Sequence, residues 1–157
     1  MKRFYRDIII VTLAIVLSIF IKIGVDDFFM GTIYTVSGIM FSIGISILVT
    51  FNLHGIKKKT FIDKIRANIN RVRNAFIHYF VFSTIIFITE RYLRKSSNNI
   101  TTIYQSESLS IDFNFSFVVS FLIFYCIFYF VLNFLEVQNL NNSITDNTNA
   151  KENTNAN

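Results

Sequence analysis

An uninterrupted run of 26 uncharged residues, from Phe28 to Leu53, constrains this chain more than any other feature. A helix that crosses the hydrocarbon core of a bilayer needs about 20 predominantly apolar residues, because lipid offers no hydrogen-bond partners to an open backbone. Only 16% of the whole chain is charged, whereas a typical soluble chain is about 25% charged. The sequence therefore favours a membrane protein over a soluble domain.

Residues 28–53 are expected to form one helix that crosses the membrane, and three further apolar runs are expected to form the others. The run 8–24 follows a basic opening and is not followed by a small-residue cleavage site, so we interpret it as a retained anchor. The run 75–89 is short for a span, but a helical pattern in phase with it precedes it, so it is interpreted as the membrane half of a longer helix. The last of the three runs is 113–135. Together, the four runs predict an all-α integral membrane protein with four transmembrane helices within residues 1–137.

Two segments outside the spans are expected to be less regular. Residues 138–157 are rich in Asn and Thr and nearly devoid of apolar residues, so they are predicted to form a disordered tail. Residues 90–112 are interpreted as an irregular connection with a short ordered piece at most. Aromatic residues alternate at the start of the fourth run, as in a strand, but the length and apolarity of that run favour a helix; these residues are Phe113, Phe115 and Phe117.

Basic residues are distributed unevenly between the two sides of this topology. With both termini on one side, that side holds eleven Lys and Arg residues, and the other side holds three, or four if Lys22 is counted there. Lys and Arg concentrate in cytoplasmic loops. Both termini are therefore expected in the cytoplasm, and the protein is expected in the bacterial inner membrane.

The segment 60–74 is predicted to form a basic amphipathic helix that runs into the third span. Its apolar residues recur at spacings of three and four, which indicates one stripe of a helix: Ile62, Ile65, Ile69, Val72 and Phe76. One interpretation is contact with anionic lipid headgroups. The other is a receptor surface for a phosphate-bearing trigger, such as a nucleotide or nucleic acid, or for a cytoplasmic protein. Sequence-specific nucleic-acid binding is not expected, because no aromatic platform or known binding module adjoins the charges. The basic surface comprises Lys57, Lys58, Lys59, Lys64, Arg66, Arg71 and Arg73.

Small residues recur along one face of the second span and predict a helix-packing seam, because small side chains let two helices approach closely. The partner helix is expected either in the same chain or in a second copy, which would make a homo-oligomer. Pore lining by the hydroxyls is disfavoured, since hydroxyls in spans usually bond to their own helix. The seam comprises Gly31, Thr35, Gly38, Ser42 and Ser46, with Ser37 and Gly44 on a neighbouring stripe.

Residues able to carry out chemistry are sparse. The single cysteine, Cys126, and the two histidines, His54 and His78, do not match the spacing of a metal site. The acidic residues are expected at span ends or in loops, with Glu90 and Arg91 as an interfacial pair, which argues against an ion-coupled transporter. No enzymatic activity, cofactor or metal is therefore expected.

The four spans and the basic loop 55–74 resemble the plan of small multi-pass effectors of bacterial phage-defence systems, including membrane proteins paired with retrons or with nucleotide-signalling synthases. The resemblance implies a protein that stays silent until a partner or signal triggers assembly or membrane disruption, as in abortive infection. The expected function is therefore a membrane-perturbing effector triggered at its basic helix. The alternative is a structural or accessory membrane protein that scaffolds another complex without enzymatic or pore activity.

Overall fold

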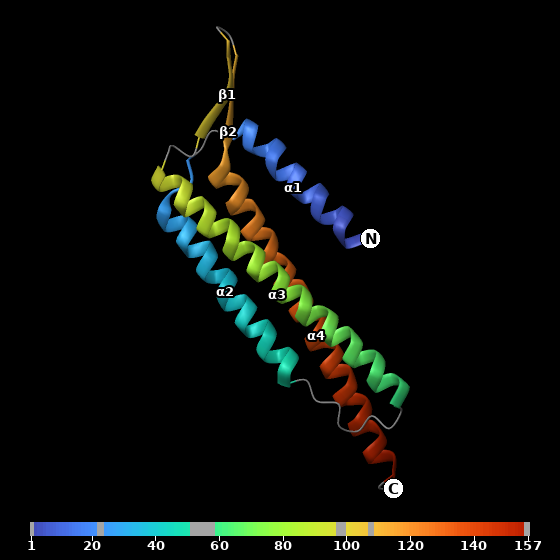
Figure 1. The fold of residues 1–157 in the computed structure, drawn as a ribbon. Coiled ribbons are helices and arrows are strands. Elements are labelled where there is room, and N and C mark those ends of the chain that lie inside the picture. Colours follow the sequence, from blue (N-terminus) through green and yellow to red (C-terminus); the bar gives the residue numbers. More distant parts are fainter. Residues whose placement is uncertain (1, 22–23, 51–58, 97–99, 107–108, 156–157) are drawn as a thin grey trace.

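The computed structural model describes residues 2–21, 24–50, 59–96, 100–106 and 109–155 as four helices and one β-hairpin. The helices are α1 (Lys2–Phe20), α2 (Asp27–Thr50), α3 (Lys59–Ser96) and α4 (Phe115–Asn155), and the strands are β1 (Ile100–Ser106) and β2 (Leu109–Asn114) (Figure 1). The strands pair antiparallel, with an irregularity between Thr102 and Tyr104. The expected continuous helix through the third span is confirmed, because α3 covers both the basic segment and the apolar one.

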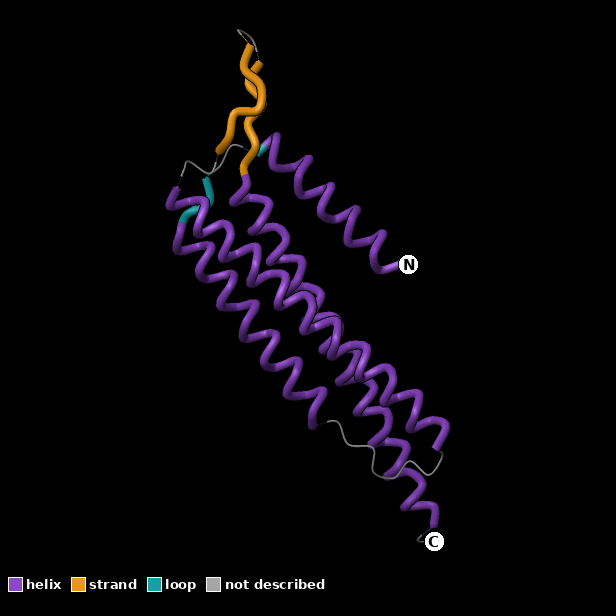
Figure 2. Tube along the Cα trace, in the orientation of Figure 1, coloured by secondary structure: helices purple, strands orange, loops and turns teal. Residues whose placement is uncertain are grey.

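Three of the helices, α2, α3 and α4, pack against one another as a bundle, and α1 lies beside α4. The hairpin extends from one end of this bundle and also contacts α1 (Figure 2). We call this the hairpin end. The opposite end, where α2 finishes and α3 begins, is called the basic end, because exposed basic side chains gather there on α3: Lys59, Lys64, Arg66, Arg71 and Arg73.

Three helices are long and apolar enough to cross a membrane: Asp27–Thr50, Ile62–Lys95 and Phe115–Ile144. Each also exposes large apolar side chains, such as Phe28 at 82% and Phe128 at 61%, which a membrane would cover. These features indicate a membrane protein.

The helix α1 is not among these candidate spans within the part of the chain that the structure describes. It ends at Phe20, so its apolar part from Ile8 is only about 20 Å long at 1.5 Å per residue, against about 30 Å of hydrocarbon. Only three of the four expected spans therefore have the required length, and the first expected span, 8–24, stays a prediction.

Local hydrogen bonds explain where two of the helices begin. Asp26 precedes α2, and its Oδ1 accepts a hydrogen bond of 2.6 Å from the backbone N–H of Phe29. Asn114 ends β2, and its Oδ1 accepts one of 3.1 Å from the N–H of Phe117. Such side-chain caps satisfy amides that have no partner inside the helix. The chain thus turns from strand to helix at Asn114, and residues 113–114 belong to β2 instead of the fourth span.

The structure differs from expectation in both polar segments. Of the expected irregular connection 90–112, residues 90–96 continue α3, and residues 100–106 and 109–112 belong to the hairpin, which fits the β-branched and aromatic residues of β1. The helix α4 continues through residues 138–155, where a disordered tail is expected. Extending an existing helix is much easier than starting one, and the chain has no Pro and no Gly beyond Gly55 to interrupt it.

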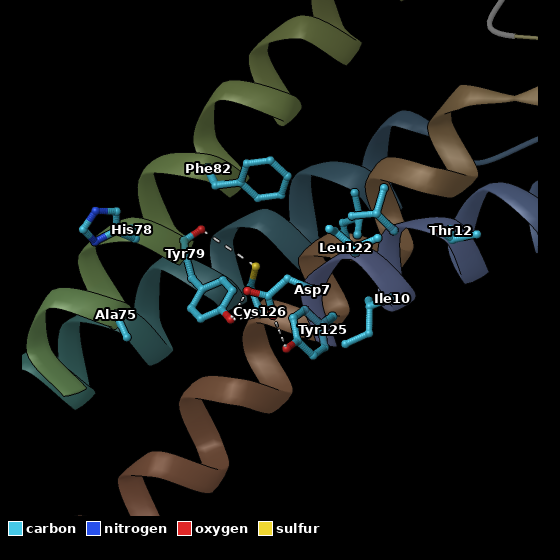
Figure 3. A pocket seen from close by; sticks show the side chains of 12 residues that line it. Asp7, Ile10, Thr12, Ala75, His78, Tyr79, Phe82, Leu122, Tyr125 and Cys126 are labelled. Atoms are coloured by element: carbon cyan, nitrogen blue, oxygen red, sulfur yellow. Dashed lines mark hydrogen bonds between the residues drawn. The ribbon is translucent and has the colours of Figure 1, made fainter. Parts of the chain in front are cut away.

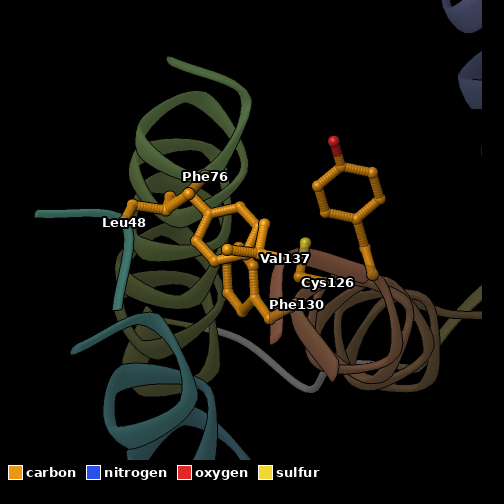
Figure 4. Close-up of a cluster of buried hydrophobic side chains, with 6 residues drawn as sticks. Leu48, Phe76, Cys126, Phe130 and Val137 are labelled. Atoms are coloured by element: carbon orange, nitrogen blue, oxygen red, sulfur yellow. The ribbon is translucent and has the colours of Figure 1, made fainter. Parts of the chain in front are cut away.

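The largest buried cluster joins α2, α3 and α4 between the middle of the bundle and the basic end. The ring of Phe76 on α3 lies between the backbone of α2 and the ring of Phe130 on α4, at a centroid distance of 4.9 Å from the latter (Figure 4). An ideal Cβ on Gly44 would lie 2.1 Å from Cε2 of Phe76. Gly44 is therefore the position at which α2 comes close enough to enclose this ring.

Candidate functional site

The apolar stripe of the basic helix packs inside the bundle. Ile65 and Phe76 are buried, at 4% and 1% exposure, and Ile69 and Val72 pack against the cluster around Phe130. This stripe is therefore not available to sink into a bilayer surface, which the lipid-headgroup interpretation requires. The basic side chains at Lys59, Lys64, Arg66, Arg71 and Arg73 are all exposed, whereas Lys57 and Lys58 lie outside the described residues.

Three of the five residues of the predicted seam on α2 face away from the helices of its own chain. Thr35, Ser42 and Ser46 are exposed, and each hydroxyl donates to the carbonyl four residues earlier, at 2.8–2.9 Å. Gly31 and Gly38 border α3, where an added Cβ would meet only single atoms at 3.6 Å and 3.9 Å. Packing within the chain uses the neighbouring stripe instead: Met30, Ile33, Ser37, Gly44 and Leu48.

A polar cluster that the sequence does not predict connects α1 to α3 and α4. The carboxylate of Asp7 accepts hydrogen bonds from the hydroxyls of Tyr79, at 2.9 Å, and Tyr125, at 3.2 Å. The guanidinium of Arg6 donates to the Tyr79 hydroxyl at 2.9 Å and lies 3.4 Å from the Asp7 carboxylate. Figure 3 shows Asp7 between the two tyrosines. We call these four residues the Asp7 cluster.

The Asp7 cluster lies at the depth of the apolar spans. Phe41 of α2 stacks on Phe80 at 4.3 Å, which places Tyr79 at about the level of Phe41. From there α2 continues to Thr50, about 13 Å further along its axis. A bilayer centred on α2, which is about 36 Å long, would cover Asp7 by about 10 Å of hydrocarbon. The amino end of α1 accordingly lies beside the middle of the bundle (Figure 1).

Asp7 lies near the amino end of α1, as expected, but this end packs beside Tyr79 of α3 and Tyr125 of α4 and not beyond the ends of these helices. Ionisable residues at membrane depth are rare, and they mark functional sites when they occur. The sequence argument against an ion-coupled transporter relied on the absence of ionisable residues among the spans. Because Asp7 lies between Tyr79 and Tyr125, that argument no longer applies. Tyrosines in otherwise Phe-rich spans, at Tyr79 and Tyr125, are the signal that could have pointed to a polar partner.

A cavity of about 570 Å³ adjoins the Asp7 cluster. It lies between α1 and α3 and is floored by α4, and its walls are mainly apolar. Cys126 lies on this floor with 1% exposure, and its thiol lies 3.8 Å from the Tyr79 carbonyl (Figure 3). A cavity of this size, apolar with a few convergent polar groups, is typical of a ligand site.

A second polar network holds the hairpin end together. Glu90 is fully buried, and its Oε1 accepts hydrogen bonds from Nε of Arg94, at 2.7 Å, and from the hydroxyl of Ser116, at 2.8 Å. Arg91 instead pairs with Asp27 at 2.6 Å. The expected Glu90–Arg91 pair is therefore wrong. Glu90 pairs with Arg94 of its own helix and accepts a hydrogen bond from Ser116 of α4, whereas Arg91 joins α3 to Asp27 of α2. This network is structural, because its hydrogen bonds and ion pairs hold α3 to α2 and α4 at the hairpin end.

The other candidates give no site. Within the described ranges, no three His, Cys, Asp or Glu side chains lie close enough to hold a metal ion. His78 lines the cavity, with Nδ1 2.6 Å from the carbonyl oxygen of Asn74, and His54 lies outside the described residues. The features left for function are the Asp7 cluster with its cavity, the exposed basic side chains and the exposed face of α2.

Comparisons with known proteins do not assign a family. Searches against protein-family models, curated proteins and solved structures find no match to this chain. Function must therefore be inferred from the residues and their geometry.

Proposed function

We propose that this protein is a bacterial inner-membrane effector that perturbs the bilayer when a partner or signal binds its basic end. The observation that carries the proposal is the position of Arg6 and Asp7. A short helix holds both residues at the depth of the longer spans, where they bond to Tyr79 and Tyr125. Disruption of the membrane and a role in phage defence are parts of this proposal.

The physical basis is the cost of charge in hydrocarbon. An Arg or Asp at the centre of a span costs about 2.5–3.5 kcal/mol on insertion scales, and the bilayer lowers this cost by thinning and by admitting water. In the packed structure the tyrosine hydroxyls and the Arg6–Asp7 contact satisfy these groups. Moving α1 away from α3 and α4 would remove the partners. The bilayer would then have to thin around the two charged side chains, which is the proposed perturbation.

The helix α3 connects the proposed trigger surface to this cluster. It is continuous from Lys59 to Ser96, about 57 Å in length, and exposes its basic side chains along the first part. Tyr79 lies on the same helix, about 9 Å beyond Arg73. A partner that binds the basic end and shifts or rotates α3 would therefore move the Tyr79 hydroxyl relative to Asp7. This coupling favours the receptor interpretation of the basic surface.

The test is expression of the protein in bacteria together with its triggering partner. The readouts are entry of a dye into the cells and loss of the membrane potential. We expect wild type to admit the dye, and a variant with Gln at Lys64, Arg66, Arg71 and Arg73 to lose this activity while inserting normally. The four changes remove four positive charges from the surface at which the partner or signal is proposed to bind. A control with Lys at the three arginines keeps the charge. Normal dye entry by the Gln variant would contradict a trigger at this surface.

The alternative function is a scaffold that holds another membrane complex together. The exposed face of α2 favours it, because its hydroxyls are satisfied within the helix and its small side chains admit close approach of another helix. A scaffold predicts no dye entry under any condition, together with copurification of a membrane partner that is lost in a Ser42→Leu variant. Dye entry on expression would rule it out.

A further inference from the structure

The side of α3 and α4 that faces α1 remains polar beyond the amino end of α1. The helix α1 reaches only to the middle of the bundle, whereas α3 and α4 continue to the basic end (Figure 1). On α4, polar residues follow Tyr125 at spacings of four, four and three, which keeps them on one side of a helix. On α3, Arg71 lies seven residues before His78, which lines the cavity. We call these residues the polar flank: Arg71, His78, Tyr125, Tyr129, Asn133 and Glu136.

Other sides of the same helices are apolar at this depth. Ile77 of α3 is 43% exposed, and Phe128 and Leu132 of α4 are 61% and 46% exposed. Each of them lies within one turn of a residue of the polar flank, and each presents a surface that lipid tails cover. Polar and ionisable side chains within spans instead face the bundle interior or a water-filled cavity. Water is therefore the occupant that the polar flank fits.

The polar flank is long enough to reach the membrane surface at the basic end. Arg71 lies eight residues before Tyr79, and Glu136 lies eleven after Tyr125, which corresponds to about 12 Å and about 16 Å along the helices. The hydrocarbon of a bilayer centred on α2 would cover Asp7 by about 10 Å. The side chains of Arg71 and Glu136 are both exposed. Water that enters beside them meets a polar residue on each turn of α4 as far as the Asp7 cluster.

On the opposite side of Asp7, an apolar contact ends this route. The cavity continues from Asp7 along α1 as far as Thr12. Ala14, the next residue of α1 but one, is fully buried and packs with Val118 and Leu122 of α4. Leu122 also lines the cavity, so this contact closes the cavity toward the hairpin end. Among the described helices, Asp7 is therefore open toward the basic end and closed toward the hairpin end.

The carboxylate of Asp7 has one oxygen that is less engaged than the other. Its Oδ1 accepts hydrogen bonds from Tyr125, at 3.2 Å, and from Arg6, at 3.4 Å. The Tyr79 hydroxyl is shared between Oδ1 and Oδ2, at 2.9 Å and 3.0 Å, and it is the one donor to Oδ2 within the described ranges. The Asp7 side chain is 37% exposed, so Oδ2 can also bond to water.

A proton suits this oxygen better than a metal cation does. A hard metal cation needs several oxygen ligands, and no three His, Cys, Asp or Glu side chains gather in the part of the chain that the structure describes. His78 can pass a proton, because its Nδ1 donates to the carbonyl oxygen of Asn74 at 2.6 Å and Nε2 is then the nitrogen that takes one up. The titratable and charged groups that face Asp7 are Arg6, Tyr79, His78, Tyr125 and Cys126.

We propose that the polar flank is a water-filled entrance from the basic end, and that the Asp7 carboxylate at its inner end binds a proton. A hydronium ion in the entrance transfers its proton to Oδ2 and leaves a water molecule, so no other reactant is needed. The chain thereby holds one proton at membrane depth that exchanges with one side only. This inference does not rest on the effector function, because its tests measure labelling of thiols and carboxyls and not entry of a dye.

The first test measures whether water reaches His78. In a Cys126→Ser background, His78→Cys and Ile77→Cys place a thiol at nearly the same depth on two sides of α3, and both positions are exposed. A charged, membrane-impermeant methanethiosulfonate is added to vesicles from the side of the basic end, which labelling of a Lys64→Cys variant identifies. We expect the His78→Cys thiol to react at least about tenfold faster, because a charged reagent does not enter hydrocarbon.

A correction for intrinsic reactivity makes the two thiols comparable. The labelling rate of each variant in membranes is divided by its rate in denaturing detergent, where both thiols are fully accessible. A corrected ratio near one, whether both thiols react in membranes or neither does, would overturn the proposed entrance.

The second test uses the unchanged chain and measures the proton itself. Dicyclohexylcarbodiimide is apolar and adds to a carboxyl group that carries a proton, and mass spectrometry of peptides locates the adduct. We expect an adduct on Asp7 that forms faster when the side of the basic end is acidified, and at an unchanged rate when the side of the hairpin end is acidified. The proton site would be overturned if Asp7 forms no adduct, if its rate ignores the pH at the basic end, or if it follows the pH of both sides equally.

Discussion

Alanine at Gly44 tests the closest helix contact in the bundle. The added Cβ would lie 2.1 Å from Cε2, 2.9 Å from Cδ2 and 3.2 Å from Cζ of Phe76. The ring has little room to retreat, because Phe76 is 1% exposed and its ring contacts those of Phe130 and Tyr129 at centroid distances of 4.9 Å and 6.1 Å. The helices α2 and α3 must therefore separate locally.

Gly38 on the same helix provides the control for this change. Its added Cβ would meet Phe80 at 3.9 Å, which is ordinary van der Waals contact. Alanine is favoured over glycine in a helix by about 1 kcal/mol, and this gain applies equally to both positions. The difference between the two variants therefore isolates the steric cost, which is about 1–3 kcal/mol for an overpacked core.

Thermal unfolding of both variants in the same detergent measures this difference. We expect Gly44→Ala to unfold below Gly38→Ala by about 2–12 °C, since about 1 kcal/mol moves the midpoint of a chain this size by about 2–4 °C. Phe76→Leu should recover part of the loss in the Gly44→Ala background, because the two sites are directly coupled. Equal stability of the two alanine variants would refute the close approach of α2 and α3 at Phe76.

Three further predictions concern the Asp7 cluster, the exposed face of α2 and the topology. Tyr79→Phe removes a hydrogen bond that holds α1, so labelling of Cys126 by N-ethylmaleimide should accelerate; an unchanged rate would show that the bond does not hold α1. Ser42→Leu adds bulk on the exposed face of α2 and should lower the yield of crosslinked oligomer without affecting insertion; an unchanged yield would mean that this face meets only lipid. Reporters after residue 157 and within 59–74 should read cytoplasmic and one within 100–106 periplasmic, and a periplasmic carboxyl end would contradict the proposed orientation.

Much of the secondary structure followed from local patterns. The uncharged run from Phe28 and the apolar run before Leu135 each lie largely within one helix, because hydropathy and helix length are properties of consecutive residues. The in-phase pattern that joins the basic segment to the third span likewise predicted the continuous helix α3. The hydropathy pattern wrongly placed residues 113–114 in the fourth span. The capping side chain of Asn114 and the pairing of β2 with β1 determine where β2 ends and α4 begins.

The faces that meet in the bundle were decided only by the tertiary structure. The second span carries two neighbouring stripes of small residues, and the structure buries the one with Ser37 and Gly44 while the one with Ser42 stays outside. Lipid and a protein interior are both apolar, so hydrophobicity does not distinguish a helix face that packs on protein from one that meets lipid. That choice depends on shape, here on the fit of the Phe76 ring against Gly44.

The Asp7 cluster shows the same division between sequence and tertiary structure. The sequence determined that a charged pair precedes a short apolar helix, and that Tyr79 and Tyr125 interrupt Phe-rich spans. The sequence could not determine how far along the bundle Asp7 lies, because the position of α1 depends on its contacts with α4 and β2. Packing against residues far apart in the sequence placed Asp7 beside the two tyrosines, and a local pattern holds no information about such contacts.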